Sequence, residues 1–79
     1  MADHSKREQG RVQWFKTDEG YGRIISQEFN DILFVHFSSI VQASGFRALS
    51  EGQLVEYTRT LQPGPDGIRA VATQVVAVQ

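Results

Sequence analysis

The chain has 79 residues, so it supports a single domain that buries only about 60% of its unfolded surface, and a large enzyme is excluded. Hydrophobic residues make up 41% and charged residues 22%, which is typical of a folded globular domain and too apolar for a disordered tail. Eight Lys and Arg against nine Asp and Glu give a formal net charge of -1, so the strongly basic character of many nucleic-acid binders is missing.

Several classes of site are also absent from the sequence. There is no cysteine, which removes disulfides, thiol catalysis and cysteine-rich zinc sites and makes the cytoplasm the expected compartment. His4 and His36 are far apart and lack metal-ligand spacing, and no phosphate-binding glycine loop or dinucleotide fingerprint occurs. No apolar run approaches the roughly 20 residues of a membrane span. We therefore expect no metal, no cofactor and no membrane association.

The first half of the chain predicts an arm and three strands. The first nine residues are polar and carry charges of both signs, so we expect a flexible arm over 1–9 and a folded domain over 10–79. Three stretches rich in β-branched and aromatic residues follow, separated by turn residues. The expected strands span 10–16, 21–26 and 32–37.

The second half predicts a connection and a hairpin. A short helical turn is expected at 38–41, and a long connection follows over 42–52. Two further strands, over 53–61 and 68–78, flank the strong turn signal Pro63–Gly67. The alanines near the end leave a helix over 70–78 as the alternative, but valines and a threonine there favour a strand.

Five short strands with no covering helix must hide their apolar faces by closing on themselves. We predict an all-β fold, a small five-stranded antiparallel barrel of the oligonucleotide-binding type, because its long connection falls between the third and fourth strands. An SH3-like barrel remains the topological alternative. The aliphatic residues expected in its core are Val12, Ile24, Leu33, Val35, Ile40, Leu54, Val55 and Val71.

Aromatic residues are too numerous to fit inside so small a barrel. Seven of the eight fall between Trp14 and Phe46. Strand alternation places Phe34 and His36 on the face opposite to the aliphatic core, and Phe37 can join them only if the strand ends or bulges there.

Exposed rings beside polar groups form a platform on which unpaired bases stack, at about 1–3 kcal/mol per base. Gly20 and Gly22 flank Tyr21, and we expect them to leave room for a base to approach that ring. The alternative is that these rings are core residues.

Four segments together carry a family resemblance: Gly10-Arg-Val-Gln-Trp-Phe-Lys, Glu19-Gly-Tyr-Gly-Arg-Ile-Ile, Phe34-Val-His-Phe-Ser-Ser-Ile and Gly45-Phe-Arg-Ala-Leu. In this order and spacing they resemble the cold-shock domain, over about residues 10–75. The resemblance implies a barrel that binds single-stranded RNA and DNA, acting as an RNA chaperone or as a regulator of transcription and translation. The binding residues that it implies are Trp14, Phe15, Lys16, Tyr21, Arg23, Asp31, Phe34, His36, Phe37 and Phe46.

Departures from the family pattern fall on four positions. Gln13 and Glu19 stand where the family commonly has lysine, and Arg23 stands where it commonly has an aromatic residue. Arg23 can still stack on a base and approach phosphate, unless it forms a surface ion pair with Glu19. The family's acidic residue maps onto Asp31 only with a slip or bulge.

These patterns favour a monomeric, sequence-tolerant single-strand binder rather than an enzyme, since no nucleophile with an orienting base can be argued from spacing. The strand's backbone is expected near Lys16, Arg23, Arg47 and the Lys6-Arg7 pair. Because few cations are present, the salt dependence should be shallow. The competing hypothesis is a protein-interaction barrel that uses the same aromatic patch.

Overall fold

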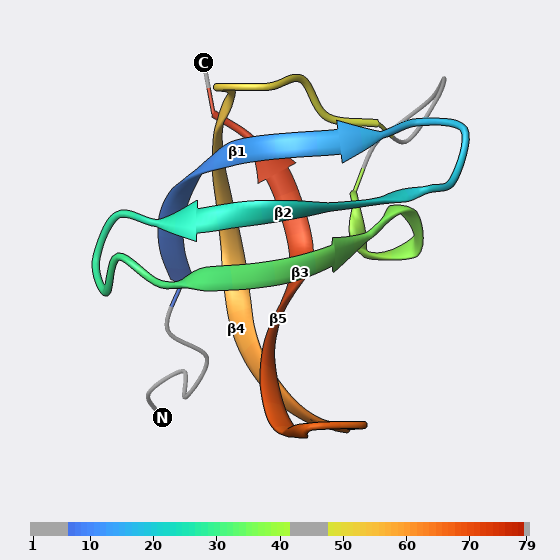
Figure 1. Ribbon diagram of the computed structural model, residues 1–79. Helices are drawn as coiled ribbons and strands as arrows, with labels where there is room; N and C mark the ends of the chain where they lie inside the picture. The colour runs from blue at the N-terminus through green and yellow to red at the C-terminus, as the bar shows by residue number, and fades with distance from the viewer. Residues whose placement is uncertain (1–6, 42–47, 79) are drawn as a thin grey trace.

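The computed structural model describes residues 7–41 and 48–78, which form five strands and one short 3-10 helix (Figure 1). Strands β1, β2 and β3 form a meander that faces the viewer in Figure 1, and β4 and β5 cross behind it. The elements are β1 (Arg7–Lys16), β2 (Tyr21–Ser26), β3 (Ile32–His36), η1 (Phe37–Ser39), β4 (Leu54–Gly64) and β5 (Gly67–Ala77).

The strands close into a barrel in the order β1-β2-β3-β5-β4, which confirms the expected fold. Four of the strand pairs are antiparallel, whereas β3 meets β5 in parallel through the pair Phe34 and Val71. The hairpin of β4 and β5 turns through Pro65 and Asp66 and extends as a two-stranded ribbon beyond the barrel (Figure 1). The helical alternative for the last segment is wrong, because this stretch pairs with β4 along its length.

Strand β1 begins at Arg7, three residues before the start expected at Gly10. Arg7, Glu8 and Gln9 continue the antiparallel ladder with β4, and the guanidinium of Arg7 donates to the Thr58 hydroxyl at 3.1 Å. Polar residues have low strand propensity, but this ladder and the burial of Glu8 override it. Residues 7–9 therefore belong to the barrel.

The core consists mainly of the residues expected from strand alternation. Seven of the eight aliphatic residues are buried, and only Leu54 is half-buried. The sequence did not indicate that Tyr57 is fully buried at 0% exposure or that Val75 joins the core. Val75 is buried because Gln74, with its left-handed backbone (φ 51), forms a bulge that turns Val75 inward against β4.

Candidate nucleic-acid interface

Six side chains form a regular grid on the outer face of the meander. Residues that pair across antiparallel strands lie on the same face, so each row of the grid crosses β1, β2 and β3 in turn. One row is Lys16, Tyr21 and His36, and the next is Trp14, Arg23 and Phe34. We call these six residues the aromatic face.

The rings of the aromatic face contact one another diagonally between the rows. Tyr21 and Phe34 are nearly parallel, with centroids 5.6 Å apart and planes inclined by 24°. Trp14 meets Tyr21 edge to face at 5.8 Å. All three rings are half-buried, so each leaves part of its surface to solvent. The alternative that the aromatic residues are simply core is wrong for these three.

A β-bulge in β1 decides which aromatic residue faces outward. The register with β2 shifts between Val12 and Trp14, so Gln13 has no partner in this ladder. The extra residue inverts the alternation, so Trp14 joins the outer grid while Phe15 packs against the core. The resemblance implied Phe15 as a binding residue, whereas in the structure it is half-buried and packs against the core.

The two glycines around Tyr21 make room for aromatic packing. A Cβ atom on Gly22 would clash first with the backbone carbonyl oxygen of Trp14 and would lie 2.7 Å from the ring of Phe15, and one on Gly20 would lie 2.7 Å from the ring of Phe37. Gly20 also has φ 79, a conformation that side chains disfavour. These contacts differ from our expectation that the glycines clear a path for a base.

Phe37 reaches the aromatic face because β3 ends at His36 and η1 begins with Phe37, as the alternation required. The rings of His36 and Phe37 are 4.6 Å apart, and Phe37 is 44% exposed. The backbone N–H of Ser38 donates to Nδ1 of His36 at 3.3 Å. The hydroxyl of Ser38 lies 2.9 Å from the same nitrogen, so two groups of Ser38 hold the imidazole ring in place.

Two cations flank the indole of Trp14. The guanidinium carbon of Arg23 lies 5.5 Å from the ring centroid, and the Lys16 ammonium lies 5.6 Å from it. The alternative ion pair of Arg23 with Glu19 does not form among the described residues. Glu19 instead raises the pKa of the Tyr21 phenol, chiefly by hydrogen bonding and then by its charge.

Asp31 lies just before β3, and the β2–β3 ladder runs without a register shift from Ile25 and Ile32 to Tyr21 and His36. The bulge that the family alignment required near Asp31 is therefore absent from this ladder. An exposed isoleucine, Ile32, stands at the start of the strand, and the Asp31 carboxylate turns to Arg59.

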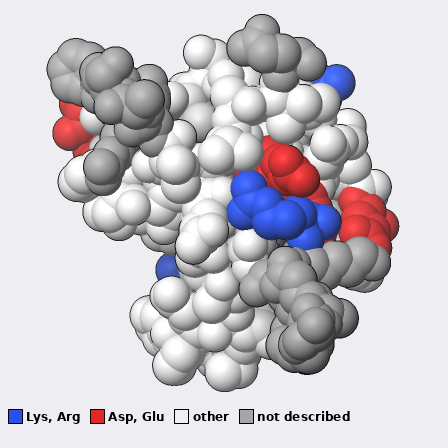
Figure 2. All heavy atoms as spheres, turned by 180° about the vertical axis from the view of Figure 1, so that it is seen from behind, with Lys and Arg blue, Asp and Glu red and all other residues white. Residues whose placement is uncertain are grey.

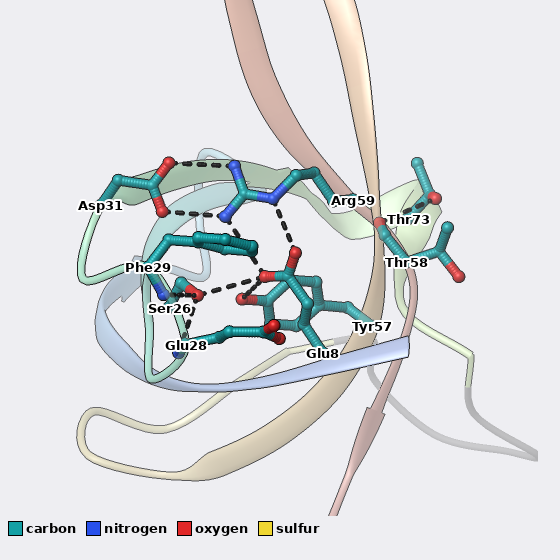
Figure 3. Close-up of polar contacts among 9 residues, drawn as sticks. All are labelled: Glu8, Ser26, Glu28, Phe29, Asp31, Tyr57, Thr58, Arg59 and Thr73. Carbon is teal, nitrogen blue, oxygen red and sulfur yellow. Dashed lines mark hydrogen bonds and ion pairs between the residues drawn. The ribbon is translucent and has the colours of Figure 1, made fainter. Parts of the chain in front are cut away.

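Behind this end of the meander lies a polar cluster around Arg59 (Figure 3). Its guanidinium bonds the two oxygens of Asp31 at 2.8 and 2.9 Å and those of Glu8 at 2.7 and 3.2 Å. The hydroxyls of Ser26 and Tyr57 also donate to Glu8, both at 3.1 Å. We call Glu8, Ser26, Asp31, Tyr57 and Arg59 the Glu8 cluster.

The hydrogen bonds of the Glu8 cluster keep its two carboxyl groups ionised. Burial by itself would raise the pKa of Glu8, but donors from Arg59, Tyr57 and Ser26 outweigh it and hold that pKa below its ordinary value. The Arg59 guanidinium likewise lowers the pKa of Asp31, and burial raises the pKa of Tyr57 to about 12. Both carboxylates are therefore ionised near neutral pH.

A groove of about 730 Å³ joins the aromatic face to the Glu8 cluster and to the β4–β5 hairpin. Sequence reasoning missed the hairpin side, where the guanidinium of Arg69 lies 5.6 Å from the ring of Phe34. It also missed the part played by Arg59. No motif marks these two arginines, because only barrel closure brings β5 beside β3 and Arg59 of β4 to Asp31. The groove is lined by Trp14, Tyr21, Arg23, Asp31, Ile32, Phe34, Arg59, Leu61, Ile68, Arg69 and Ala70.

Several of the expected binding residues do not line this groove or fall outside the part of the chain that the structure describes. Phe46, Arg47 and Lys6 fall outside the described residues. Arg7 bonds to Thr58 and to the carbonyl of Glu56, on the side of β4. Within residues 7–41 and 48–78, no three metal-ligating side chains lie together and no helix is long and apolar enough to span a membrane.

The surface seen from the opposite side of the molecule shows no broad basic area (Figure 2). The largest basic group in that view lies against acidic groups, and most of the described surface around them is uncharged.

Comparison with known proteins identifies consistent relatives. A family model described as the 'Cold-shock' DNA-binding domain matches residues 8–77. Cold shock protein CapB of Pseudomonas syringae pv. tomato is 43% identical over 72 residues, which cover 91% of this chain and 99% of that protein. Major cold shock protein CspA of Pseudomonas aeruginosa is 44% identical over the same shares. The cold shock-like protein of Thermotoga maritima is 43% identical over 85% of this chain and 96% of its own length.

A solved structure gives the same answer for the fold. The structure described as drosophila Unr CSD456 matches with a TM-score of 0.69 at 25% identity. The match covers 96% of this chain but only 28% of that one. The present chain thus corresponds to about a quarter of the larger protein.

Proposed function

Because the chain belongs to the cold-shock domain family, whose members bind nucleic acids, we propose that it holds single-stranded RNA and DNA by stacking unpaired bases on the aromatic face. The observation that carries this proposal is the grid itself, in which three half-exposed rings and three cationic or hydrogen-bonding side chains alternate across β1, β2 and β3. Stacking tolerates any sequence, because every base presents a π-face.

The rings and the cations of the aromatic face have different roles in this proposal, which follow from their chemistry. Trp14, Tyr21 and Phe34 take the base faces, and Phe37 extends the row at the end of β3. Lys16 and Arg23 have no carboxylate partner among the described residues, so their charges remain available to the strand's phosphates. Paired bases in a duplex cannot expose their faces, which makes the site selective for single strands.

This binding supports a role as an RNA chaperone. A protein that binds only unpaired bases shifts the population of an RNA from folded to unfolded by its differential affinity alone, without a nucleotide cofactor. The same shift regulates transcription or translation where the structured form of a transcript acts as a signal. We propose that the protein acts in this way as a monomer in the cytoplasm.

Trp14 offers a direct test, because it is the sole tryptophan of the chain and lies within the grid. Titration with a short oligothymidine should quench its fluorescence strongly and saturably, and a duplex of the same length should not compete. Lack of any response at low salt would refute the proposal and would favour the competing hypothesis that the patch docks a protein.

A further inference from the structure

Phe29 has a position that the proposed binding site does not explain. It is 59% exposed, although it is a large apolar ring, and it projects from the turn between β2 and β3. Its ring lies against the guanidinium of Arg59, with 4.9 Å between the ring centroid and the guanidinium carbon (Figure 3). An aromatic ring held on a cation is well placed for a further stacking partner.

The turn that carries Phe29 is fixed before any ligand arrives. The Ser26 hydroxyl accepts the backbone N–H groups of Glu28 and Phe29 at 3.2 and 3.1 Å. The carbonyl of Ser26 accepts the N–H of Asn30 at 2.9 Å, and Asn30 adopts the left-handed φ of 58 that closes the turn. Because Ser26 itself donates to buried Glu8, the turn is tied to the Glu8 cluster. Such preorganisation reduces the entropy cost of binding.

The position of Phe29 continues the aromatic face. Along β2 and β3, the row after Arg23 and Phe34 is Ile25 and Ile32, and the turn follows directly. A cavity of about 310 Å³ is lined by Phe29, Asp31 and Arg59, and the last two also line the larger groove. A strand stacked on Trp14, Tyr21 and Phe34 can therefore pass over Ile32 and reach Phe29 without leaving the surface.

We propose that Phe29, supported by Arg59, forms an additional base-stacking subsite at the β2–β3 turn for the single strand held by the aromatic face. The inference rests on the proposed function. The occupant is a base rather than a phosphate, because the one positive charge of Arg59 is surrounded by the two carboxylates of Glu8 and Asp31. The local charge is negative, so a phosphate would be repelled there.

The test compares Phe29→Leu, which keeps an apolar cover over Arg59 but removes the ring, with Phe29→Tyr, which keeps the ring. Affinities are measured for oligothymidines of about four to ten nucleotides, within the roughly 4–16 nucleotides that one barrel of this type binds. Phe29→Leu should weaken binding of the longer strands by roughly 5- to 160-fold and leave the shortest unchanged. Phe29→Tyr should behave as the wild type.

Salt provides the second readout. If Phe29 takes a base, the log-log dependence of affinity on salt has the same slope in the wild type and in Phe29→Leu. A smaller slope in the variant would overturn the assignment of a base. Val41→Ala is the matched control, since Val41 is 57% exposed, apolar and outside both cavities.

A measurement on the wild-type protein tests for ligand contact at the turn without any substitution, so a structural effect of Phe29→Leu does not enter. The amide resonances of Phe29 and Asn30 should shift on addition of a long strand and remain in place with the shortest one. Equal affinity of Phe29→Leu and wild type at every length would overturn the subsite while leaving the aromatic face intact. Failure of the wild type to bind any length would refute the proposed function, and the subsite with it.

Discussion

The aromatic face and the Glu8 cluster are neighbours on the barrel, but they differ in whether their charged side chains are paired with each other. In the Glu8 cluster, both carboxylates and the guanidinium of Arg59 satisfy one another (Figure 3). On the aromatic face, the cationic groups of Lys16 and Arg23 lie near the ring of Trp14 and have no carboxylate partner among residues 7–41 and 48–78. The charges of the Glu8 cluster are therefore paired within the fold, whereas those two cations are not.

The formal net charge of -1 hides a local difference between these two regions. In the Glu8 cluster, two carboxylates and one guanidinium leave one negative charge. On the aromatic face, Lys16 and Arg23 have no carboxylate partner among the described residues, so the local charge there differs from the net charge. Four changes separate the two regions experimentally.

The largest effect is expected for Glu8→Ala. The substitution leaves the hydroxyls of Ser26 and Tyr57 without their acceptor and removes one of the two carboxylates on Arg59. The free energy of unfolding should fall by about 3 kcal/mol or more, measured by urea denaturation. Exposed Glu51→Ala is the control and should change it by less than about 0.5 kcal/mol. A similar loss in both variants would show that the cluster contributes nothing special.

Phe37→Ala, in contrast to Glu8→Ala, should reduce affinity for single strands more than it reduces the free energy of unfolding. Phe37 is 44% exposed, so its loss should weaken single-strand binding by about 1–3 kcal/mol with little change in stability. Phe34→Ala should weaken binding by a similar amount. Fluorescence titration gives the affinity, and thermal unfolding gives the stability. If both variants instead unfold and bind equally poorly at any temperature, the rings act through the stability of the fold and not through stacking.

Acid should affect stability through the Glu8 cluster. The pKa values of Glu8 and Asp31 lie below their ordinary values of 4.5 and 3.8 in the folded chain, so folding favours the ionised carboxylates. Their contribution is complete above those ordinary values and is lost as the pH falls through the lowered pKa values. Urea midpoints measured from pH 7 downward should therefore decrease in acid. Glu8→Gln should show a weaker decrease, and an equal one would contradict this origin.

Arg23→Phe should have the smallest effect. The substitution restores the aromatic residue common in the family but removes a cation from the groove, so affinity at moderate salt should fall by less than about 1 kcal/mol. The slope of log affinity against log salt should decrease by up to about 0.7, the value for one phosphate contact on a single strand. Unchanged or improved affinity at moderate salt would show that Arg23 makes no ionic contact.

The sequence predicted the elements that depend on local patterns. Alternation located β2 and β3 and most of the aliphatic core, and the Pro63–Gly67 turn signal located the β4–β5 hairpin. It also anticipated that His36 and Phe37 share a face only if the strand ends between them. These features follow from the period of a strand and from turn chemistry, which neighbouring residues determine.

The features that the sequence missed depend on contacts between distant segments. Residues 7–9 looked like an arm because Glu8 is polar, and its burial becomes favourable through the distant donors Ser26, Tyr57 and Arg59. The bulge at Gln13 turns Trp14 outward and Phe15 toward the core, and no local pattern in the sequence indicates it. The resemblance implied Asp31 as a binding residue, but nothing near it in the sequence indicated that its carboxylate pairs with the distant Arg59.

The parallel meeting of β3 and β5 has a consequence for the order of folding. The meander and the β4–β5 hairpin are each made of strands adjacent in sequence, so they can form early with little loss of chain entropy. The barrel closes when β1 pairs with β4 and when, on the other side of the hairpin, Phe34 reaches Val71 and Ile40 reaches Val75. The β3–β5 contact is the shorter of these two junctions. We therefore expect this closure to form late and to open first in native-state hydrogen exchange. Since Phe34 belongs to both the closure and the aromatic face, a bound strand should slow that opening.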